Sequence, residues 1–508
     1  MNESKQRKIG VVLSYLSIVV NTLVQLLYTP LLIRKLGQSE YGLYSLVASI
    51  IGYLAIMDLG FGNAIVVYTS KYRAQKKYDN ERKLHGMFNI VFKIIGIVAA
   101  FLGLILYFNV NNIFGNTLSS TELEKMKIMM LILSFNMFIT FSFAIYNSII
   151  TAYEKFAFQK IISIIYTLLK PMLMIPLLFL GYKSISLCVI ITLANLITLV
   201  SNYYYCRKKL EIKIKFFGFD KKLFKEILGY SLWIFLAIVV SKVNWSLDNF
   251  ILGAVSGTIA VSIYSIASTL NQMFIQLSTA ISNVFLPKIS KLVAQSATSE
   301  KLTNEMIRIG RLQNYIIFLM CSGLVLFGKE FIKIWAGTGF EESYYVALLL
   351  IIPVCIPLIQ NLGLSIMQAM NKYKFKSIST AIMSIFNLII SIFLAKKYGA
   401  TGAAFGTCLS LIICNIILIN IYYHKELKLN MIKFWKSIIK QTIPLFFPIV
   451  LIFIFMYFVS LKGFFGFLVN IIIYSLLYAI IAYLLSMDTY EKELINDFLI
   501  KVHLKRGN

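Results

Sequence analysis

Long apolar runs, separated by short charged breaks, recur along the whole chain. A membrane-spanning helix needs roughly 20 apolar residues, whereas a spanning β-strand would alternate apolar and polar positions. The pattern therefore predicts an all-α polytopic membrane protein with about fourteen transmembrane helices. The predicted helices cover residues 9–33, 41–69, 87–110, 126–151, 161–181, 184–205, 227–254, 257–287, 312–336, 344–370, 377–396, 402–424, 438–461 and 463–487.

The composition agrees with a lipid environment, since 59% of the 508 residues are hydrophobic and 14% are charged. The net charge of +27 could indicate a nucleic-acid partner. However, the basic residues lie mainly in the breaks between apolar runs, where membrane topology places them. We therefore expect no nucleic-acid partner and a multi-pass protein of the bacterial cytoplasmic membrane. The excess of Lys and Arg in the even-numbered breaks predicts that both termini are cytoplasmic. We expect the first apolar run to be a retained helix, because no small-residue cleavage site follows it.

The sequence contains an internal repeat. Residues 148–161 read SIITAYEKFAFQKI, and residues 365–378 read SIMQAMNKYKFKSI. Six identities fall at one offset of 217 residues, and Phe158 with Phe375 is one of them. A second pair of segments, Asn-Tyr-Tyr-Tyr from 202 and Asn-Ile-Tyr-Tyr from 420, lies at nearly the same offset. The repeat predicts a duplicated architecture.

Each repeat unit holds six predicted helices, an even number, so both units insert with the same orientation. They should be related by a parallel pseudo-two-fold axis along the membrane normal. We expect an N-terminal lobe over residues 1–215, a C-terminal lobe over 216–435, two additional helices over 436–487 and a cytoplasmic tail over 488–508. A cleft between two lobes is the geometry of an alternating-access transporter.

Polar residues at helical spacing predict which faces line such a cavity. They occupy one face of each of three predicted helices. The alternative is that Ser, Thr and Asn hold helices together inside a bundle. The predicted cavity-lining residues are Ser14, Ser17, Asn21, Gln25, Ser241, Asn244, Thr269, Gln272 and Gln276.

Four charged residues fall inside apolar runs. An uncompensated charge at mid-bilayer costs about 3 kcal/mol, so such residues usually face a cavity or a partner. Lys170 and Lys242 are predicted to contact an anionic head group, and structural pairing is the alternative. Asp58 and Asp248 are predicted structural or gating residues, which could form ion pairs with nearby Lys or Arg.

Several chemistries lack their motifs. The chain has no GxxxxGK[ST] phosphate loop, and its six cysteines include no CxxC pair. We therefore expect no catalytic residue, no metal site and no cofactor. Na⁺ or H⁺ remains open as a coupling ion.

The segments TPLLIRKLGQSEYGLYSLVASIIGYLAIMDLGFGNAIV (29–66) and WSLDNFILGAVSGTIAVSIYSIAS (245–268) resemble the polysaccharide transporters. These are the O-antigen and capsule flippases of the superfamily that also holds multidrug (MATE) exporters and the lipid II flippase. The resemblance implies a V-shaped, two-lobed protein that moves undecaprenyl-diphosphate-linked oligosaccharide to the outer leaflet. It further implies that cavity cations hold the diphosphate. Asp58 and Asp248 lie inside the two similar segments. The arginine cluster of the lipid II flippase has no clear match, since Arg34 is the only arginine between residues 9 and 69.

Two other functions stay open at this point. A drug or ion antiporter of the same fold would favour acidic residues in its interior. A membrane enzyme of glycan assembly would be expected to carry a large charged outer segment. The expected partners are the lipid-linked oligosaccharide, membrane lipids and, in the same process, a glycan polymerase or glycosyltransferases.

Overall fold

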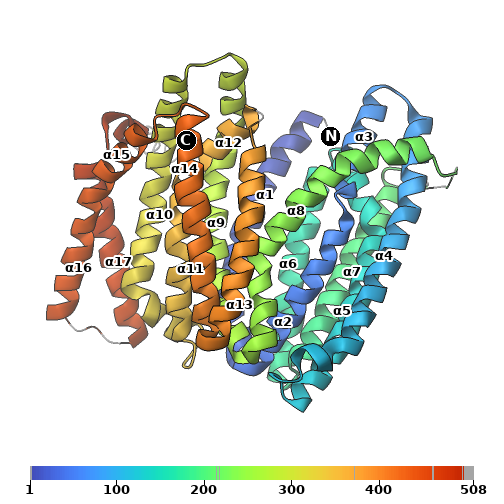
Figure 1. Ribbon diagram of the computed structural model, residues 1–508, viewed down its shortest axis with the longest axis horizontal. Coiled ribbons are helices and arrows are strands. Elements are labelled where there is room, and N and C mark those ends of the chain that lie inside the picture. The colour runs from blue at the N-terminus through green and yellow to red at the C-terminus, as the bar shows by residue number, and fades with distance from the viewer. Residues whose placement is uncertain are drawn as a thin grey trace, which may run out of the picture. The chain divides into compact units, whose positions relative to one another are not determined.

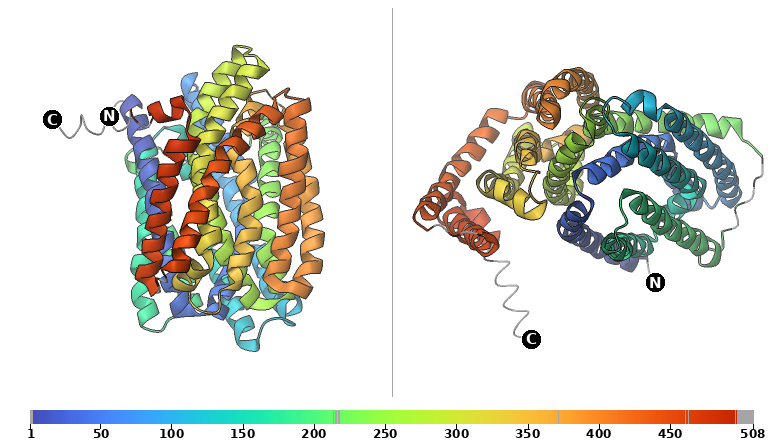
Figure 2. Two further views of the ribbon diagram at one scale, coloured as in Figure 1. Left: turned by 90° about the vertical axis from the view of Figure 1, so that its left-hand side faces the viewer. Right: turned by 90° about the horizontal axis from the view of Figure 1, so that it is seen from below.

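The computed structural model describes residues 3–494, except 213, 215, 217, 371, 460 and 462, together with residue 496. Side chains are described over the same residues apart from 3–12, 15, 230, 233–234, 236–238, 240–246, 277, 280–284, 286–287 and 290. Throughout this described part every regular element is a helix, and the long helices of each compact unit run side by side (Figure 1, Figure 2). The predicted all-α fold is confirmed.

The chain divides into two compact units, and each is described by itself. Unit 1 comprises Met1–Ser265 and Ile392–Ala403. Its helices are α1 (Glu3–Leu36), α2 (Gln38–Leu54), η1 (Ala55–Asp58), α3 (Phe61–Ala74), α4 (Tyr78–Phe114), α5 (Ser120–Ala152), α6 (Phe156–Phe179), α7 (Ser184–Lys208), α8 (Lys221–Val255) and the first part of α9 (Gly257–Ala294).

Unit 2 comprises Ile266–Ser391 and Ala404–Asn508. It holds the rest of α9 and most of α13 (Lys374–Leu411). Its other helices are α10 (Ser299–Trp335), α11 (Glu342–Ile359), α12 (Asn361–Ala369), η2 (Ile412–Leu418), α14 (Ile419–Lys425), α15 (Met431–Thr442), η3 (Ile443–Phe446), α16 (Phe447–Phe458), α17 (Gly463–Ile481) and η4 (Ala482–Ser486). The lobe boundaries at 215 and 435 stay predictions.

Twelve segments of the described residues are long and apolar enough to cross a membrane. One of them, Lys374–Lys425, contains the two predicted helices 377–396 and 402–424. They meet at Gly399, whose φ of 55° and ψ of −135° are not helical. Helix α8 contains the predicted helix 227–254 but is not among the twelve. The number fourteen therefore stays a prediction.

Three predicted helices are interrupted in the structure. The run 41–69 forms α2, η1 and α3, and the break lies at Leu59 and Gly60. The run 344–370 forms α11 and α12, which meet at Gln360. The run 438–461 forms the end of α15, the 3₁₀ turn η3 and α16, with Pro444 and Pro448 at the junctions. Proline lacks the backbone N–H that a continuous helix requires. Hydropathy alone does not predict where a helix is interrupted, because these runs stay apolar on both sides of each break.

Several helices begin well before their apolar runs. Helix α10 starts at Ser299 instead of the predicted 312, and the Thr298 hydroxyl caps it by accepting a bond from the Lys301 N–H. Polar residues such as Glu300 continue the helix beyond the apolar region. The hydrophobic run therefore predicts the membrane-spanning part of a helix and underestimates its length.

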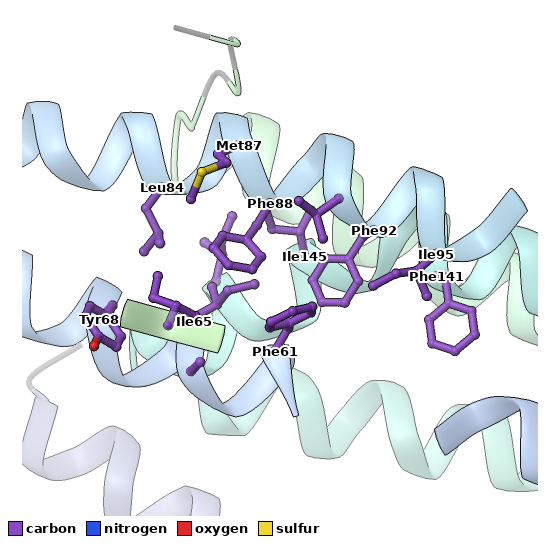
Figure 3. Close-up of a cluster of buried hydrophobic side chains, with 14 of the residues drawn as sticks. Phe61, Ile65, Tyr68, Leu84, Met87, Phe88, Phe92, Ile95, Phe141 and Ile145 are labelled. Atoms are coloured by element: carbon purple, nitrogen blue, oxygen red, sulfur yellow. The ribbon is translucent and has the colours of Figure 1, made fainter. Parts of the chain in front are cut away.

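The core of unit 1 lies between α3, α4 and α5 (Figure 3). Phe61 and Phe88 meet edge to face, with ring centroids 5.2 Å apart. Such a pair contributes about 0.5–1.5 kcal/mol beyond its buried area. Inside a membrane, close packing has to supply this stability, since lipid tails are as apolar as the side chains.

The inner faces of unit 1 also rely on close backbone approach. A Cβ at Gly42 of α2 would lie 1.9 Å from the carbonyl oxygen of Thr258 at the start of α9. Any larger residue at this position would force the two helices apart. Small residues at helix contacts are the usual device for tight packing in membranes.

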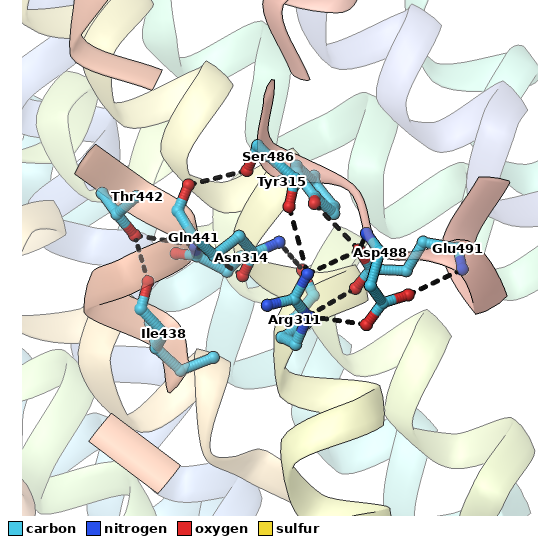
Figure 4. A network of polar contacts seen from close by, with 9 residues as sticks. All are labelled: Arg311, Asn314, Tyr315, Ile438, Gln441, Thr442, Ser486, Asp488 and Glu491. Atoms are coloured by element: carbon cyan, nitrogen blue, oxygen red, sulfur yellow. Dashed lines mark hydrogen bonds and ion pairs between the residues drawn. The ribbon is translucent and has the colours of Figure 1, made fainter. Parts of the chain in front are cut away.

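A buried polar network joins the last helices to α10 in unit 2 (Figure 4). The Arg311 guanidinium donates to both carboxylate oxygens of Glu491, with N–O distances of 2.7 Å each. Tyr315 donates to the same carboxylate at 3.0 Å. The Gln441 amide donates to the Arg311 carbonyl, and the Ser486 hydroxyl donates to the Gln441 carbonyl. The two additional helices are therefore an integral part of unit 2.

The internal repeat is visible in the local geometry of both units. Phe158 stacks on Tyr205 with centroids 3.9 Å apart, and Phe375 stacks on Tyr422 with centroids 4.2 Å apart. Both residues of the second pair lie 217 positions after those of the first. The backbone turns after these helices also match, because the bond from 210 N–H to 205 C=O recurs from 427 to 422. The predicted repeat is confirmed at this level.

Candidate functional site

A cavity of about 200 Å³ lies inside unit 1, between α1, α2, α6 and α7. Its wall is apolar on the side of α7 and polar on the sides of α1 and α6. Among the described residues that line it, Lys170 is the only charged one. The polar residues of the wall include Asn21, Gln25, Tyr28 and Thr167.

Lys170 occupies the middle of α6, directly before Pro171. Its ammonium lies over the ring of Tyr166, 4.3 Å from the centroid. Among the described side chains, no carboxylate forms an ion pair with Lys170. A cation–π contact contributes about 0.5–2 kcal/mol, which is less than the cost of about 3 kcal/mol for a charge deep in a membrane. The site therefore favours water or an anion beside Lys170.

Asn21 and Thr167 connect α1 to α6 at the edge of the cavity. The Thr167 hydroxyl donates to the Asn21 carboxamide oxygen at 3.0 Å. The Asn21 amide donates in turn to the Ser17 carbonyl at 2.8 Å, and Ser17 itself is buried. This chain of bonds holds the polar face of α1 against the helix that carries Lys170.

Gln25 provides the clearest unsatisfied group of the cavity. Its side-chain oxygen is shielded from solvent and has no hydrogen-bond partner in the described part of the chain. A buried acceptor without a donor costs about 1–3 kcal/mol. Gln25 therefore has a free acceptor for a bound water, hydroxyl or ligand N–H.

The cavity brings together three of the residues predicted from sequence, Asn21, Gln25 and Lys170. Ser17 adjoins it through Asn21, and Ser14 lies half-buried one turn earlier on α1. On α9, Thr269, Gln272 and Gln276 are half-buried and belong to unit 2. Lys242, Ser241 and Asn244 lie outside the residues whose side chains are described.

Asp58 lies at a break between α2 and α3. The chain passes through η1, then through Leu59 and Gly60, whose φ values of 52° and 73° are left-handed. The Gly62 N–H donates to the Asp58 carboxylate. No ion pair with Asp58 occurs among the described side chains, so the sequence-based alternative of a Lys or Arg partner finds no support there.

Asp248 has a different environment, although it was predicted in the same class. It is 2% exposed, and the Tyr264 hydroxyl donates to its Oδ2 atom. This bond ties α8 to the start of α9 within unit 1. A gating role for either acid stays a prediction.

Sequence reasoning missed Thr167 and Tyr166 as parts of the site. Both stand three or four residues before Lys170, which places them on its face of the helix. That spacing was a usable signal. The contribution of α7, through Leu187 and Ile190, had no such signal because both residues are ordinary apolar positions.

Known structures share this architecture. The chain superposes on a structure of the lipid II flippase MurJ in an inward closed conformation with a TM-score of 0.74 and 19% identity, covering 96% of this chain and 99% of that one. An inward-facing multidrug resistance MATE family transporter of the MOP superfamily matches with a TM-score of 0.59 and 14% identity, covering 79% and 96%. At these identities the matches establish the fold.

Relatives also match by sequence. A candidate O-antigen transporter of Shigella flexneri is 21% identical over 406 residues, which cover 78% of this chain and 93% of the relative. A second candidate O-antigen transporter, from Salmonella typhimurium, is 23% identical and covers 78% and 91%. The capsular polysaccharide biosynthesis protein CapF of Staphylococcus aureus is 27% identical, covering 43% and 54%.

A family model described as "Polysaccharide biosynthesis protein" matches residues 8–293, more than half of the chain. The match contains both segments, 29–66 and 245–268, from which the resemblance was predicted. It also contains the whole cavity of unit 1. The chain is a multi-pass membrane protein that belongs to the polysaccharide biosynthesis protein family.

Proposed function

We propose that the chain is a flippase that moves an undecaprenyl-diphosphate-linked oligosaccharide across the bacterial cytoplasmic membrane by alternating access. The substrate enters from the cytoplasmic leaflet and leaves in the outer leaflet, where surface polysaccharide is assembled. Family membership and the similarity to candidate O-antigen transporters support this class of function. Both termini are cytoplasmic in this proposal, as the distribution of Lys and Arg indicates.

The observation that carries the proposal is Lys170 in its cavity. A cation without a carboxylate partner, deep in an apolar helix, is an unfavourable arrangement unless an anion occupies the site at some stage. A lysine ammonium binds phosphate as a compact point charge with three donors. The diphosphate of a lipid-linked sugar has this chemistry, and Lys242 is the second proposed cation.

The size of the cavity limits what it can hold. Pockets for drug-sized ligands usually measure about 300–1,000 Å³. The cavity at Lys170, at about 200 Å³, has room for a phosphate group with a few waters and not for an oligosaccharide. The glycan must lie elsewhere while the phosphate is held.

The same charge pattern disfavours the antiporter alternative. A positively charged drug would be repelled by Lys170, and the described cavity wall contains no acidic residue. An antiporter would instead use a carboxylate in that position. Glycan polymerase and glycosyltransferases are the proposed partners in the same process, and neither is required for translocation itself.

Translocation consumes no nucleotide in this proposal, since the chain has no phosphate-binding loop of the GxxxxGK[ST] type. An ion gradient, the membrane potential or the substrate gradient supplies the driving force. Na⁺ and H⁺ are the two candidate coupling ions.

The test is replacement of both proposed cations by glutamine in a strain whose own copy is deleted. The Lys170→Gln/Lys242→Gln double variant should abolish surface glycan while the protein stays at wild-type abundance in the membrane. Lys93→Gln, which makes the same exchange at an exposed lysine of α4 that does not line the cavity, serves as the control and should support normal glycan. Normal glycan in the double variant would remove the head-group assignment.

A further inference from the structure

A second cavity lies next to the first, in the same unit. It measures about 260 Å³ and lies between α5, α6 and α7. On α6 the second cavity uses residues 159–166, whereas the first uses residues 167–171. The two cavities therefore occupy successive turns of one helix, and Tyr166 stands between them with Lys170 over its ring.

The lining of this second cavity is polar and uncharged. It contains the carboxamides of Asn147, Gln159, Asn195 and Asn202, and the hydroxyls of Ser163 and Thr198. No Asp, Glu, Lys or Arg lines it among the described residues. Each carboxamide carries both hydrogen-bond donors and an acceptor, so it can pair with groups that also donate and accept. Sugar hydroxyls are such groups, whereas phosphate offers acceptors and would prefer a cation.

Part of this lining is already held in place by the protein. The Asn195 amide donates to Asn136 and to Thr140, at 2.7 Å each. The Gln159 amide donates to the Asn147 carboxamide oxygen at 3.0 Å and to the Thr151 hydroxyl at 2.6 Å. These bonds use the donors and leave other lone pairs of the amides available. The wall is thus fixed before any ligand arrives.

Asn202 is the exception within this wall. It is 6% exposed, it lines the cavity, and its carboxamide makes no hydrogen bond to another described residue. The Asn202 carboxamide opens onto this cavity, where water or a ligand can hydrogen-bond to it. Asn420, on the matching helix of unit 2 but 218 positions further on, instead accepts a bond from the Trp435 indole at 2.7 Å. Asn202 thus has donor and acceptor capacity that only an occupant of the cavity can use.

We propose that this amide-lined cavity binds one uncharged sugar ring of the substrate, with Asn202 as its principal hydrogen-bonding residue, while Lys170 holds the adjoining phosphate. This inference rests on the proposed function and assigns a place to the part of the substrate that the first cavity cannot accept. The volume corresponds to about eight waters, which is room for a single pyranose. The order along α6 matches the order of a phosphate followed by its first sugar.

The experiment compares two lipids on the purified chain in nanodiscs. One is undecaprenyl diphosphate carrying a single N-acetylhexosamine, and the other is undecaprenyl diphosphate without sugar. The wild type should bind the sugar-bearing lipid about 5- to 20-fold more tightly, the value of one or two net hydrogen bonds. Asn202→Leu should lose this preference and keep the affinity for the bare lipid.

Two control variants make the result specific. Asn420→Leu makes the same exchange at an asparagine of unit 2 outside this cavity and should keep the preference for the sugar-bearing lipid. Lys170→Gln should lower the affinity for both lipids by the same factor, so the preference for the sugar-bearing lipid should remain. Asn202→Ala replaces Asn202→Leu if the larger residue impairs folding.

The outcomes separate the two proposals. If the wild type binds both lipids equally, or if both Asn202 variants keep the preference, the sugar site is wrong while the flippase proposal stands. If the wild type binds neither lipid, the proposed function fails and the sugar site fails with it.

Discussion

Helix α6 of unit 1 and the first half of α13 in unit 2 are repeat counterparts whose corresponding polar residues make different contacts. The two helices begin at corresponding repeat positions, Phe156 and Lys374, to within one residue. Each also carries an equivalent aromatic stack, Phe158 on Tyr205 and Phe375 on Tyr422. At the offset of 217, however, Lys170 corresponds to Asn387. Lys170 faces a cavity, whereas Asn387 is 5% exposed and hydrogen-bonded to Thr407 and Ser391.

The second cavity shows the same contrast. Gln159 corresponds to Lys376, and the Lys376 ammonium donates to the Asn415 carboxamide oxygen inside unit 2. The duplicated frame is therefore retained in both units, while the residues at these corresponding positions differ in charge and in hydrogen-bond partners. We infer that substrate contacts are concentrated in the two cavities of unit 1.

The largest effect should come from a buried charge that does have a partner. Arg311→Met would leave Glu491 uncompensated in unit 2, and breaking such a pair costs about 3–5 kcal/mol. The detergent-purified variant should melt well below the wild type in a thermal unfolding assay. The double variant Arg311→Met/Glu491→Leu should recover part of the loss, because the buried carboxylate is removed with its partner and only the half-exposed Asp488 keeps its charge. A double variant as unstable as the single one would contradict this account of Figure 4.

Next in size is the exchange that gives unit 2 the residue of unit 1. Asn387→Lys places a cation at a position that is 5% exposed, among Thr407 and Ser391. The expected cost is about 3 kcal/mol, which should reduce the amount of folded protein. Membrane abundance and melting temperature measure this effect. A fully stable Asn387→Lys protein would show that the two interiors differ less than proposed.

The reverse exchange should impair transport and spare stability. Lys170→Asn removes one charge-assisted contact with phosphate, and a loss of about 10- to 100-fold in translocation rate is expected. Removing an unpaired charge from the membrane should leave the melting temperature equal or higher. Initial rates of lipid translocation and melting curves on the same preparation provide the measurement. Equal rates in variant and wild type would contradict the role of Lys170.

The smallest effect on stability should come from the aromatic stack that both units contain. Phe158→Leu and Phe375→Leu each remove one stacked pair, worth about 0.5–1.5 kcal/mol. Because the two stacks are equivalent, the two variants should lower the melting temperature by similar amounts. A strong effect at one position and none at the other would show that the repeat is no longer structurally equivalent.

Much of the fold was predictable because long apolar runs in a sequence indicate membrane-spanning helices. The repeat was predictable from positions such as Phe158 and Phe375, and the structure shows the matching ring stacks. The polar face of α1 was predictable from spacing, and Asn21 and Gln25 of that face both line the cavity of unit 1. Spacing within one helix cannot tell which other helix that face meets, so Thr167 and the wall of α7 were missed.

Contacts between distant segments were beyond sequence reasoning. Arg311 and Glu491 are 180 residues apart, and no local sequence motif around either residue predicts their contact. The hydrogen bonds of Asn387 inside unit 2 were equally unpredictable, since Asn387 looks no different from Asn202 in the sequence. Only three-dimensional packing decides that one carboxamide is satisfied and the other is free.

The most direct test of the central claim is translocation by the purified chain in liposomes without nucleotide. The substrate is an undecaprenyl-diphosphate-linked oligosaccharide, and the readout is its exposure to an impermeant sugar-modifying reagent over time. The account predicts that wild-type protein moves the lipid between leaflets and that Lys170→Asn protein, at equal incorporation, is at least about 10-fold slower. Absence of movement by the wild type, or full movement by the variant, would contradict it.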